Sequence, residues 1–253
     1  MANEKHLNNI LHGDCLELMT ELEDQSVDMI LCDLPYGVTA RNRWDVVIPF
    51  PKLWGEYERI IKDNGAIVLT AIQPFAAQLI MSNPKLFRYE WIWEKTSPTG
   101  HLNAKKMPMR AHESVLVFYK KLPTYNPQKT KGHARKASSA AHKRNSKMST
   151  NYRSYGLTSY DSTERYPRSV QVFPTDKQKE ALHPTQKPIA LLEYLIRTYT
   201  NEGDVVLDNC IGSGSTAVAA CNTNRNFIGM ELDKGYYEIA TLRVQECSKR
   251  TIC

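Results

Sequence analysis

Short apolar runs alternate with helically spaced segments along most of this chain. Val27–Cys32 and Ala66–Thr70 are almost continuously apolar, which is typical of short strands buried on both faces of a sheet. Arg88–Trp93 instead alternates polar and apolar residues, as a half-buried strand does. Further strands are predicted at Asn8–His12, Glu113–Tyr119, Asp204–Asp208 and Asn226–Glu231.

Helices are predicted between these strands. Apolar residues recur with a period of roughly 3.6 from Ile189 to Tyr199, and Phe50–Ile61 is amphipathic in the same way. Shorter helical segments are predicted at Cys15–Met19, Gln73–Met81, Ala217–Cys221 and Lys234–Val244. Strands that alternate with helices predict a doubly wound α/β fold, in which helices cover both faces of a mostly parallel sheet.

The composition of the chain changes at Lys120. From there to Lys179 it has little apolar periodicity and is rich in Lys, Ser, Thr and Asn. Ser114–Tyr160 holds 10 Lys and Arg and no Asp or Glu, whereas the other 23 Lys and Arg are outnumbered by 27 Asp and Glu. A basic segment on a mildly acidic body indicates contact with a polyanion. A solvated, disordered loop is the alternative that the same composition allows.

Bulk composition narrows the class of protein. With 253 residues, of which 42% are hydrophobic and 24% charged, the chain can bury one sizeable core. We expect no membrane span, because no apolar run reaches about 18 residues. The 6 cysteines form no Cys-x-x-Cys pair and no Cys/His ligand spacing. This spacing predicts reduced thiols in a cytoplasmic protein and no metal site.

Candidate chemistry begins where the strand Val27–Cys32 ends. The residues that follow are Asp33-Leu-Pro-Tyr-Gly37, and Pro35 and Gly37 break the strand. Ligands of open α/β sheets bind at the carboxyl ends of strands, so an acid, a main-chain carbonyl and an aromatic ring are presented at a ligand-binding edge. The string resembles the Asp/Asn/Ser-Pro-Pro-Tyr motif of the amino-methyltransferases, with Leu34 in place of the first proline.

A second candidate site follows the strand Asp204–Asp208. It consists of a glycine-rich turn, Asn209-Cys-Ile-Gly-Ser-Gly214, and of Glu231 at the end of the next strand. Such a unit is typical of nucleotide binding. A nicotinamide enzyme would use similar parts, but the third glycine of Gly-x-Gly-x-x-Gly is absent. The turn instead resembles the Asp-Pro-Phe-x-Gly-Ser-Gly-Thr of S-adenosylmethionine sites, with Asn and Cys in place of Pro and Phe.

His183-Pro-Thr-Gln-Lys-Pro188 resembles the segment before the first cofactor strand of the beta-class DNA amino-methyltransferases. The order of motifs along the chain, with the catalytic motif first and the cofactor motifs last, is the circular permutation of that class. The resemblance implies a Rossmann-like methyltransferase domain with a mixed seven-stranded sheet. Its parts would be a catalytic half (1–119), an inserted target-recognition region (120–179) and a cofactor-binding half (180–253).

The resemblance also implies the roles of single residues. Asp33 and the Leu34 carbonyl would accept the hydrogens of the target amino group, Pro35 would fix the turn, and Tyr36 would stack on a flipped base. Thr185 and Lys187 would hold the methionine carboxylate. The whole implied set of residues for S-adenosylmethionine is Asp14, Cys15, Asp33, Thr185, Lys187, Pro188, Asp208, Asn209, Gly212, Ser213, Gly214, Glu231 and Leu232. The residues predicted to contact double-stranded DNA are Arg41, Arg43, Trp44, Lys129, Lys131, Arg135, Lys143, Arg144, Lys147 and Arg153.

The implied activity is transfer of a methyl group from S-adenosylmethionine to the N6 amino group of a flipped adenine in duplex DNA. Asp33 at the first motif position favours adenine, since the cytosine enzymes more often carry Ser there. Methylation of the cytosine N4 amino group on the same fold and an inactive DNA-binding protein stay as alternatives. The resemblance further implies a prokaryotic or phage-encoded protein, with or without a restriction partner, and is compatible with a homodimer.

Overall fold

The computed structural model describes residues 5–37, 45–138, 160–175 and 186–250. The chain divides into two compact units. One comprises Met1–Asn126 together with Ser169–Cys253, and the other comprises Pro127–Arg168. Within the described ranges, no helix is long and apolar enough to cross a membrane.

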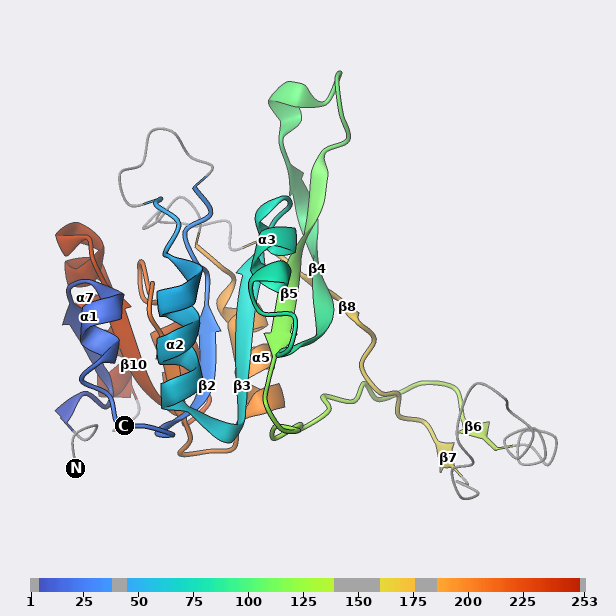
Figure 1. The fold of residues 1–253 in the computed structure, drawn as a ribbon. Helices are drawn as coiled ribbons and strands as arrows, with labels where there is room; N and C mark the ends of the chain where they lie inside the picture. Colours follow the sequence, from blue (N-terminus) through green and yellow to red (C-terminus); the bar gives the residue numbers. More distant parts are fainter. Residues whose placement is uncertain (1–4, 38–44, 139–159, 176–185, 251–253) are drawn as a thin grey trace. The chain divides into compact units, whose positions relative to one another are not determined.

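The larger unit is built on one sheet of eight strands in the order β1-β10-β9-β2-β3-β5-β4-β8 (Figure 1). These strands are β1 (Asn9–His12), β2 (Val27–Cys32), β3 (Ile61–Ala71), β4 (Phe87–Thr99), β5 (Arg110–Phe118), β8 (Val170–Phe173), β9 (Val205–Asp208) and β10 (Asn226–Glu231). Only β5 runs antiparallel to its neighbours in this sheet. The carboxyl ends of β1, β10, β9, β2 and β3 therefore meet at one edge.

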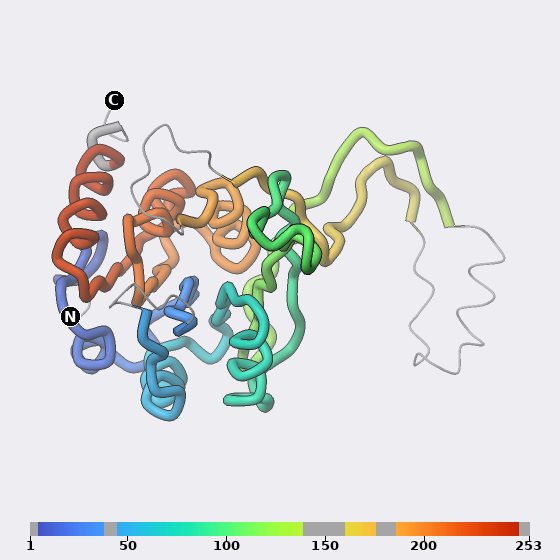
Figure 2. Tube along the Cα trace, turned by 90° about the horizontal axis from the view of Figure 1, so that it is seen from above, coloured from blue at the N-terminus to red at the C-terminus, as the bar shows by residue number. Residues whose placement is uncertain are grey.

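Helices cover both faces of the sheet (Figures 1 and 2). One face carries α1 (Cys15–Met19), α2 (Phe50–Ile60) and α3 (Phe75–Ser82), and the other carries α5 (Ile189–Tyr199), α6 (Ser215–Asn222) and α7 (Lys234–Arg250). The sequence of α2 explains why this helix packs on the sheet. The helical spacing of Leu53, Tyr57 and Ile60 buries all three side chains fully in the core. The predicted doubly wound α/β fold is thus confirmed.

The number of strands corrects the expected seven. Val170–Phe173 forms an eighth strand, which pairs in parallel with β4 from Ile92↔Val170 to Lys95↔Phe173. It lies inside the region 120–179, which the composition indicated as an insertion. As an edge strand with alternating half-buried and exposed residues, it needs little apolar sequence, so composition did not reveal it.

Polar contacts hold the smaller unit together. Its strands β6 (Lys136–Ala137) and β7 (Asp161–Ser162) pair in antiparallel fashion. Thr130 and Arg165 exchange two backbone hydrogen bonds of 3.0 and 2.9 Å. The Arg135 guanidinium lies 2.7 and 2.5 Å from the two carboxylate oxygens of Asp161. The lack of apolar periodicity in this region agrees with these contacts.

Candidate active site

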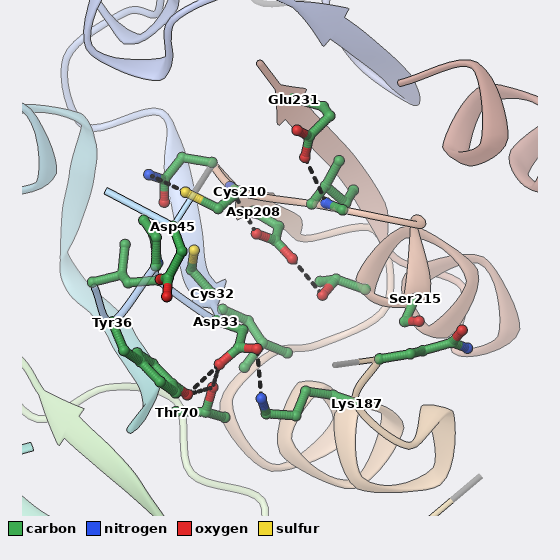
Figure 3. Close-up of a pocket in the computed structure, with 18 of the residues that line it drawn as sticks. Cys32, Asp33, Tyr36, Asp45, Thr70, Lys187, Asp208, Cys210, Ser215 and Glu231 are labelled. Carbon is green, nitrogen blue, oxygen red and sulfur yellow. Dashed lines mark hydrogen bonds and ion pairs between the residues drawn. The ribbon is translucent and has the colours of Figure 1, made fainter. Parts of the chain in front are cut away.

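A cavity of about 660 Å³ opens at the carboxyl edge of the larger unit's sheet. Four of the acids that line it each follow or end a different parallel strand: Asp14 after β1, Asp33 after β2, Asp208 in β9 and Glu231 in β10. Figure 3 shows the three labelled acids of this set around the cavity. The catalytic motif and the cofactor motif, which are far apart in the sequence, thus share one cavity, as the fold class predicts.

Asp33 is held by three hydrogen-bond donors (Figure 3). Its Oδ1 accepts hydrogen bonds from Thr70 Oγ1, at 2.5 Å, and from the Tyr36 hydroxyl. Its Oδ2 lies 2.5 Å from Lys187 Nζ. A carboxylate has about four acceptor positions, so Asp33 is fixed in orientation and still retains acceptor capacity toward the cavity.

Lys187 also links Asp33 to a second buried ion pair. Its Nζ lies 3.4 Å from Glu113 Oε2, and Glu113 Oε1 lies 2.5 Å from Lys95 Nζ. Lys95, Glu113 and Lys187 are only 8–9% exposed. Among the described residues Glu113 Oε2 has no hydrogen bond, so the charge of Lys187 is what compensates it. The result is a row of alternating charges, Lys95, Glu113, Lys187 and Asp33, which we call the charge row.

Electrostatics fixes the protonation of two of these side chains. Burial by itself lowers the pKa of Lys187, but the electrostatic interactions with Asp33, Tyr36 and Glu113 outweigh it and raise the pKa above its usual value. Burial, and next the charge of Asp33, raise the pKa of Tyr36 well above its usual value. At neutral pH Lys187 is therefore an ammonium, and Tyr36 is a phenol that donates to Asp33. The predicted contact of Lys187 with a methionine carboxylate stays a prediction beside the observed one with Asp33.

The carboxylates on the cofactor side are oriented by backbone amides. Glu231 Oε2 accepts from the Gly212 amide and Oε1 from the Asp233 amide, each at 2.8 Å. Asp14 Oδ1 accepts from the Leu16 amide at 2.8 Å and so caps α1. Both acids also line the cavity. Capping of α1 is compatible, in this position, with the cofactor contact that the resemblance implies for Asp14.

The carboxylates of Asp14 and Glu231 form a cofactor wall of the cavity. Their chemistry fits S-adenosylmethionine, which presents an amino group, two ribose hydroxyls and a positive charge. Glu231 suits the hydroxyls and Asp14 the amino group, and both belong to the implied set of cofactor residues. The described residues contain no group of three His, Cys, Asp or Glu placed to hold a metal ion. Other predicted cofactor residues that line the cavity are Cys15, Asp33, Lys187, Asp208, Asn209, Gly212, Ser213 and Leu232.

Two predicted cofactor residues, Gly214 and Pro188, do not line the cavity. Gly214 has φ +85°, and a Cβ there would lie 3.1 Å from Ala240 Cα. This glycine therefore serves the close packing of α6 on α7. Pro188 precedes α5 as its N-cap residue. Thr185 lies outside the described residues.

The predicted DNA contacts are described only in part. Lys129, Lys131 and Arg135 belong to the smaller unit. Lys129 Nζ lies 3.5 Å from Glu164 Oε2, and Arg135 is paired with Asp161, so part of their charge is already compensated. The predicted contacts that lie outside the described residues are Arg41, Arg43, Trp44, Lys143, Arg144, Lys147 and Arg153.

Asp208 gives this site a testable pH dependence. Burial raises the pKa of its carboxyl from 3.8 to about 6, although hydrogen bonds from Thr216 and the Cys210 amide oppose the rise. Between about pH 4 and pH 6 the folded protein then binds more protons than the unfolded chain, so the stability from this group falls as pH rises, by about 3 kcal/mol in total.

Urea unfolding of the wild type and of Asp208→Asn across this pH range checks the expectation. The free energy of unfolding of the wild type, relative to the variant, should decrease from about pH 4 to pH 6 and be level above that. A difference that is independent of pH would contradict the raised pKa.

Two curated proteins that are similar to this chain are both type II methyltransferases. The type II methyltransferase M.HinfI of Haemophilus influenzae is 27% identical over 95% of this chain and 69% of its own length. The type II methyltransferase M1.MboII of Moraxella bovis is 28% identical over 91% of this chain and 94% of its own length.

Solved structures show the same fold. A complex of M1.HpyAVI with SAM has a TM-score of 0.66 at 24% identity, covering 93% of this chain and 98% of that one. The PvuII cytosine-N4-specific DNA methyltransferase has a TM-score of 0.66 at 14% identity, covering 95% of this chain and 91% of that one.

The match to a family model is what assigns the chain. The model described as DNA methylase, for N6 and N4 methyltransferases, matches residues 27–242. This range begins with β2, whose end carries Asp33, and runs through the cofactor strands β9 and β10 into α7. With the Asp33 motif and the glycine-rich cofactor turn both inside the match, the chain belongs to the N6/N4 family of DNA methylases, which take their methyl group from S-adenosylmethionine.

Proposed function

We propose that this methylase acts on the N6 amino group of an adenine that is flipped out of duplex DNA into the cavity. The observation that carries the proposal is the position of Asp33. It lies at the end of β2 in the same cavity as Asp14 and Glu231, so an acceptor for amino hydrogens stands beside the proposed cofactor wall. An amino nitrogen inside a duplex cannot reach such a cavity unless its base leaves the stack.

The chain's residues would activate the amino group by accepting its hydrogens. The lone pair of an exocyclic amine is delocalised into the ring, which makes the nitrogen a poor nucleophile. Asp33 has acceptor capacity toward the cavity, and the main-chain carbonyl of Leu34 is the second predicted acceptor. S-adenosylmethionine, when bound, supplies a methyl group on a positively charged sulfur. Direct transfer then needs alignment of the amino nitrogen with that methyl group and no covalent intermediate with the protein.

Tyr36 is the residue that we propose receives the flipped base. Its hydroxyl donates to Asp33, and its ring lies 5.0 Å from the Phe75 ring, centroid to centroid. These two contacts fix the plane of the ring, which lines the cavity. A fixed aromatic face can stack on any base with a gain of about 1–3 kcal/mol. Tyr36 therefore supports base flipping without choosing between adenine and cytosine.

The choice of adenine rests on Asp33 at the first motif position. Methylation of cytosine N4 is the second candidate, because a cytosine-N4-specific enzyme shares the fold at 14% identity. We further propose that the insertion 120–179 recognises the target sequence, since it holds most of the chain's concentrated positive charge.

Sequencing genomic DNA with detection of modified bases tests the proposal. The protein would be expressed in a host that lacks DNA methylation. We expect N6-methyladenine in one sequence context. N4-methylcytosine would replace the adenine assignment with the second candidate. Unmodified DNA, from a folded protein that binds S-adenosylmethionine, would overturn the enzymatic function and leave a DNA-binding protein.

A further inference from the structure

A β-hairpin formed by the end of β4 and the start of β5 extends beyond the rest of the sheet (Figure 1). Ala71, the last residue of β3, pairs with Ser114 of β5, so the part of β5 before Ser114 and the end of β4 extend beyond the sheet's carboxyl edge. Between them lies a single 3₁₀ turn, His101–Asn103. Every residue from Pro98 to His112 is exposed. We call residues 98–112 the hairpin arm.

The base of the hairpin arm belongs to the cavity. Thr99 and Arg110 face each other in the strand register, and both line the cavity. Below them, Lys95 and Glu113 belong to the charge row that reaches Asp33. A duplex whose base entered this cavity would therefore lie directly against the arm.

The charge of the hairpin arm is entirely positive. It carries Lys105, Lys106 and Arg110, with two histidines and no Asp or Glu. Within the described part of the chain, no carboxylate pairs with any of these three cations. In the smaller unit, by contrast, Lys129 and Arg135 are paired with acids. Unpaired, exposed lysines are the groups that neutralise DNA phosphates and release counterions.

The hairpin arm also exposes apolar side chains at its tip. Leu102 is 87% exposed and Met107 is 59% exposed. A single exposed apolar side chain needs no explanation. Two of them beside unpaired cations, on an arm next to the cavity, match the pattern of proteins that place apolar side chains against unstacked bases.

We propose that the hairpin arm is a DNA-binding element that holds the duplex over the cavity. Lys105 and Lys106 contact phosphates, and Leu102 packs against bases next to the flipped nucleotide. The inference rests on the proposed base flipping in duplex DNA, and it does not depend on the choice of adenine. It places DNA contacts outside the segments where sequence reasoning expected them.

Salt-dependent DNA binding tests the phosphate contacts. The probe is a fluorescent duplex of mixed sequence, and the proteins are the full chain and Lys105→Ala/Lys106→Ala. The matched control is Lys85→Ala/Arg88→Ala, which removes the same charge from exposed residues at the other end of β4. We expect the arm variant to bind more weakly and to lower the slope of log affinity against log salt by about 2. The control should keep the slope of the wild type.

Leu102→Ala tests the tip separately. It should weaken DNA binding and leave the salt slope unchanged, because it removes an apolar contact and no charge. Met81→Ala, at a residue of α3 that is 72% exposed, is the control and should bind as the wild type does. Unchanged affinity in Leu102→Ala would overturn the contact at the tip.

Two results would overturn the hairpin arm as a whole. One is an unchanged salt slope in Lys105→Ala/Lys106→Ala, and the other is an equal change in the Lys85→Ala/Arg88→Ala control. Both can occur while the wild type still methylates genomic DNA, so they would reject the arm and leave the proposed function standing. Failure of the wild type to methylate DNA is a separate result, which rejects the function.

Discussion

Asp33→Ala is expected to lower the rate of methyl transfer by about 1,000-fold, at the upper end of the range seen when a preorganised group of an active site is removed. The side chain is the proposed acceptor of the amino hydrogens, and it also fixes Tyr36 and Lys187 through hydrogen bonds. Affinity for S-adenosylmethionine should fall far less than the rate, because Asp33 is one of many residues in the implied cofactor set and Asp14 and Glu231 are untouched. Single-turnover transfer of a labelled methyl group and calorimetric titration of the cofactor measure the two quantities.

The matched control is Asp28→Ala, which removes a carboxylate from the beginning of the same strand, β2. Asp28 accepts hydrogen bonds from Lys62 Nζ at 2.6 Å and from the Val205 amide at 3.0 Å, far from the cavity's lining. It should lose some stability and keep its transfer rate at a temperature where it is folded. Near-full transfer by Asp33→Ala would show that the site is assigned wrongly.

Local patterns predicted the elements that bury a run or a face of apolar side chains. Val27–Cys32 and Ile189–Tyr199 form β2 and α5 with the predicted bounds, because a continuous apolar run and an amphipathic spacing each leave one way to bury the side chains. The hairpin arm and β8 lack such a signal. Their conformation comes from pairing with β4 and β5, and their side chains are mostly exposed.

The residues of the site also differ in how far the sequence alone predicts them. Asp33 and Tyr36 lie within one short motif, so the sequence shows them together. Lys187 and Asp33 are 154 positions apart, and only the resemblance to a family placed them in one site. Lys95 and Glu113 escaped prediction altogether, because a charged residue in a strand reads as solvent-exposed. Only the register of β4 and β5 shows that the side chains of Lys95 and Glu113 are buried next to each other.

Lys187→Met is expected to reduce the transfer rate at saturating cofactor by about 100-fold and to lower the free energy of unfolding by about 3–5 kcal/mol. The partly buried carboxylate of Asp33 and the buried carboxylate of Glu113 would then be neighbours with no cation between them. Removal of one partner from a buried ion pair is strongly destabilising for this reason. Transfer kinetics at saturating S-adenosylmethionine and urea unfolding measure the two effects.

A double variant separates the charge row from the other role predicted for Lys187. Lys187→Met/Glu113→Gln removes one charge of each sign, so the row is neutral again and stability should fall by less than the sum of the two single variants. Transfer should not recover, because Asp33 still lacks its ammonium partner. If Lys187→Met instead transfers at the wild-type rate once the cofactor is saturating, and only its cofactor affinity falls, Lys187 serves the methionine carboxylate alone. The short contact with Asp33 would then have no part in the reaction.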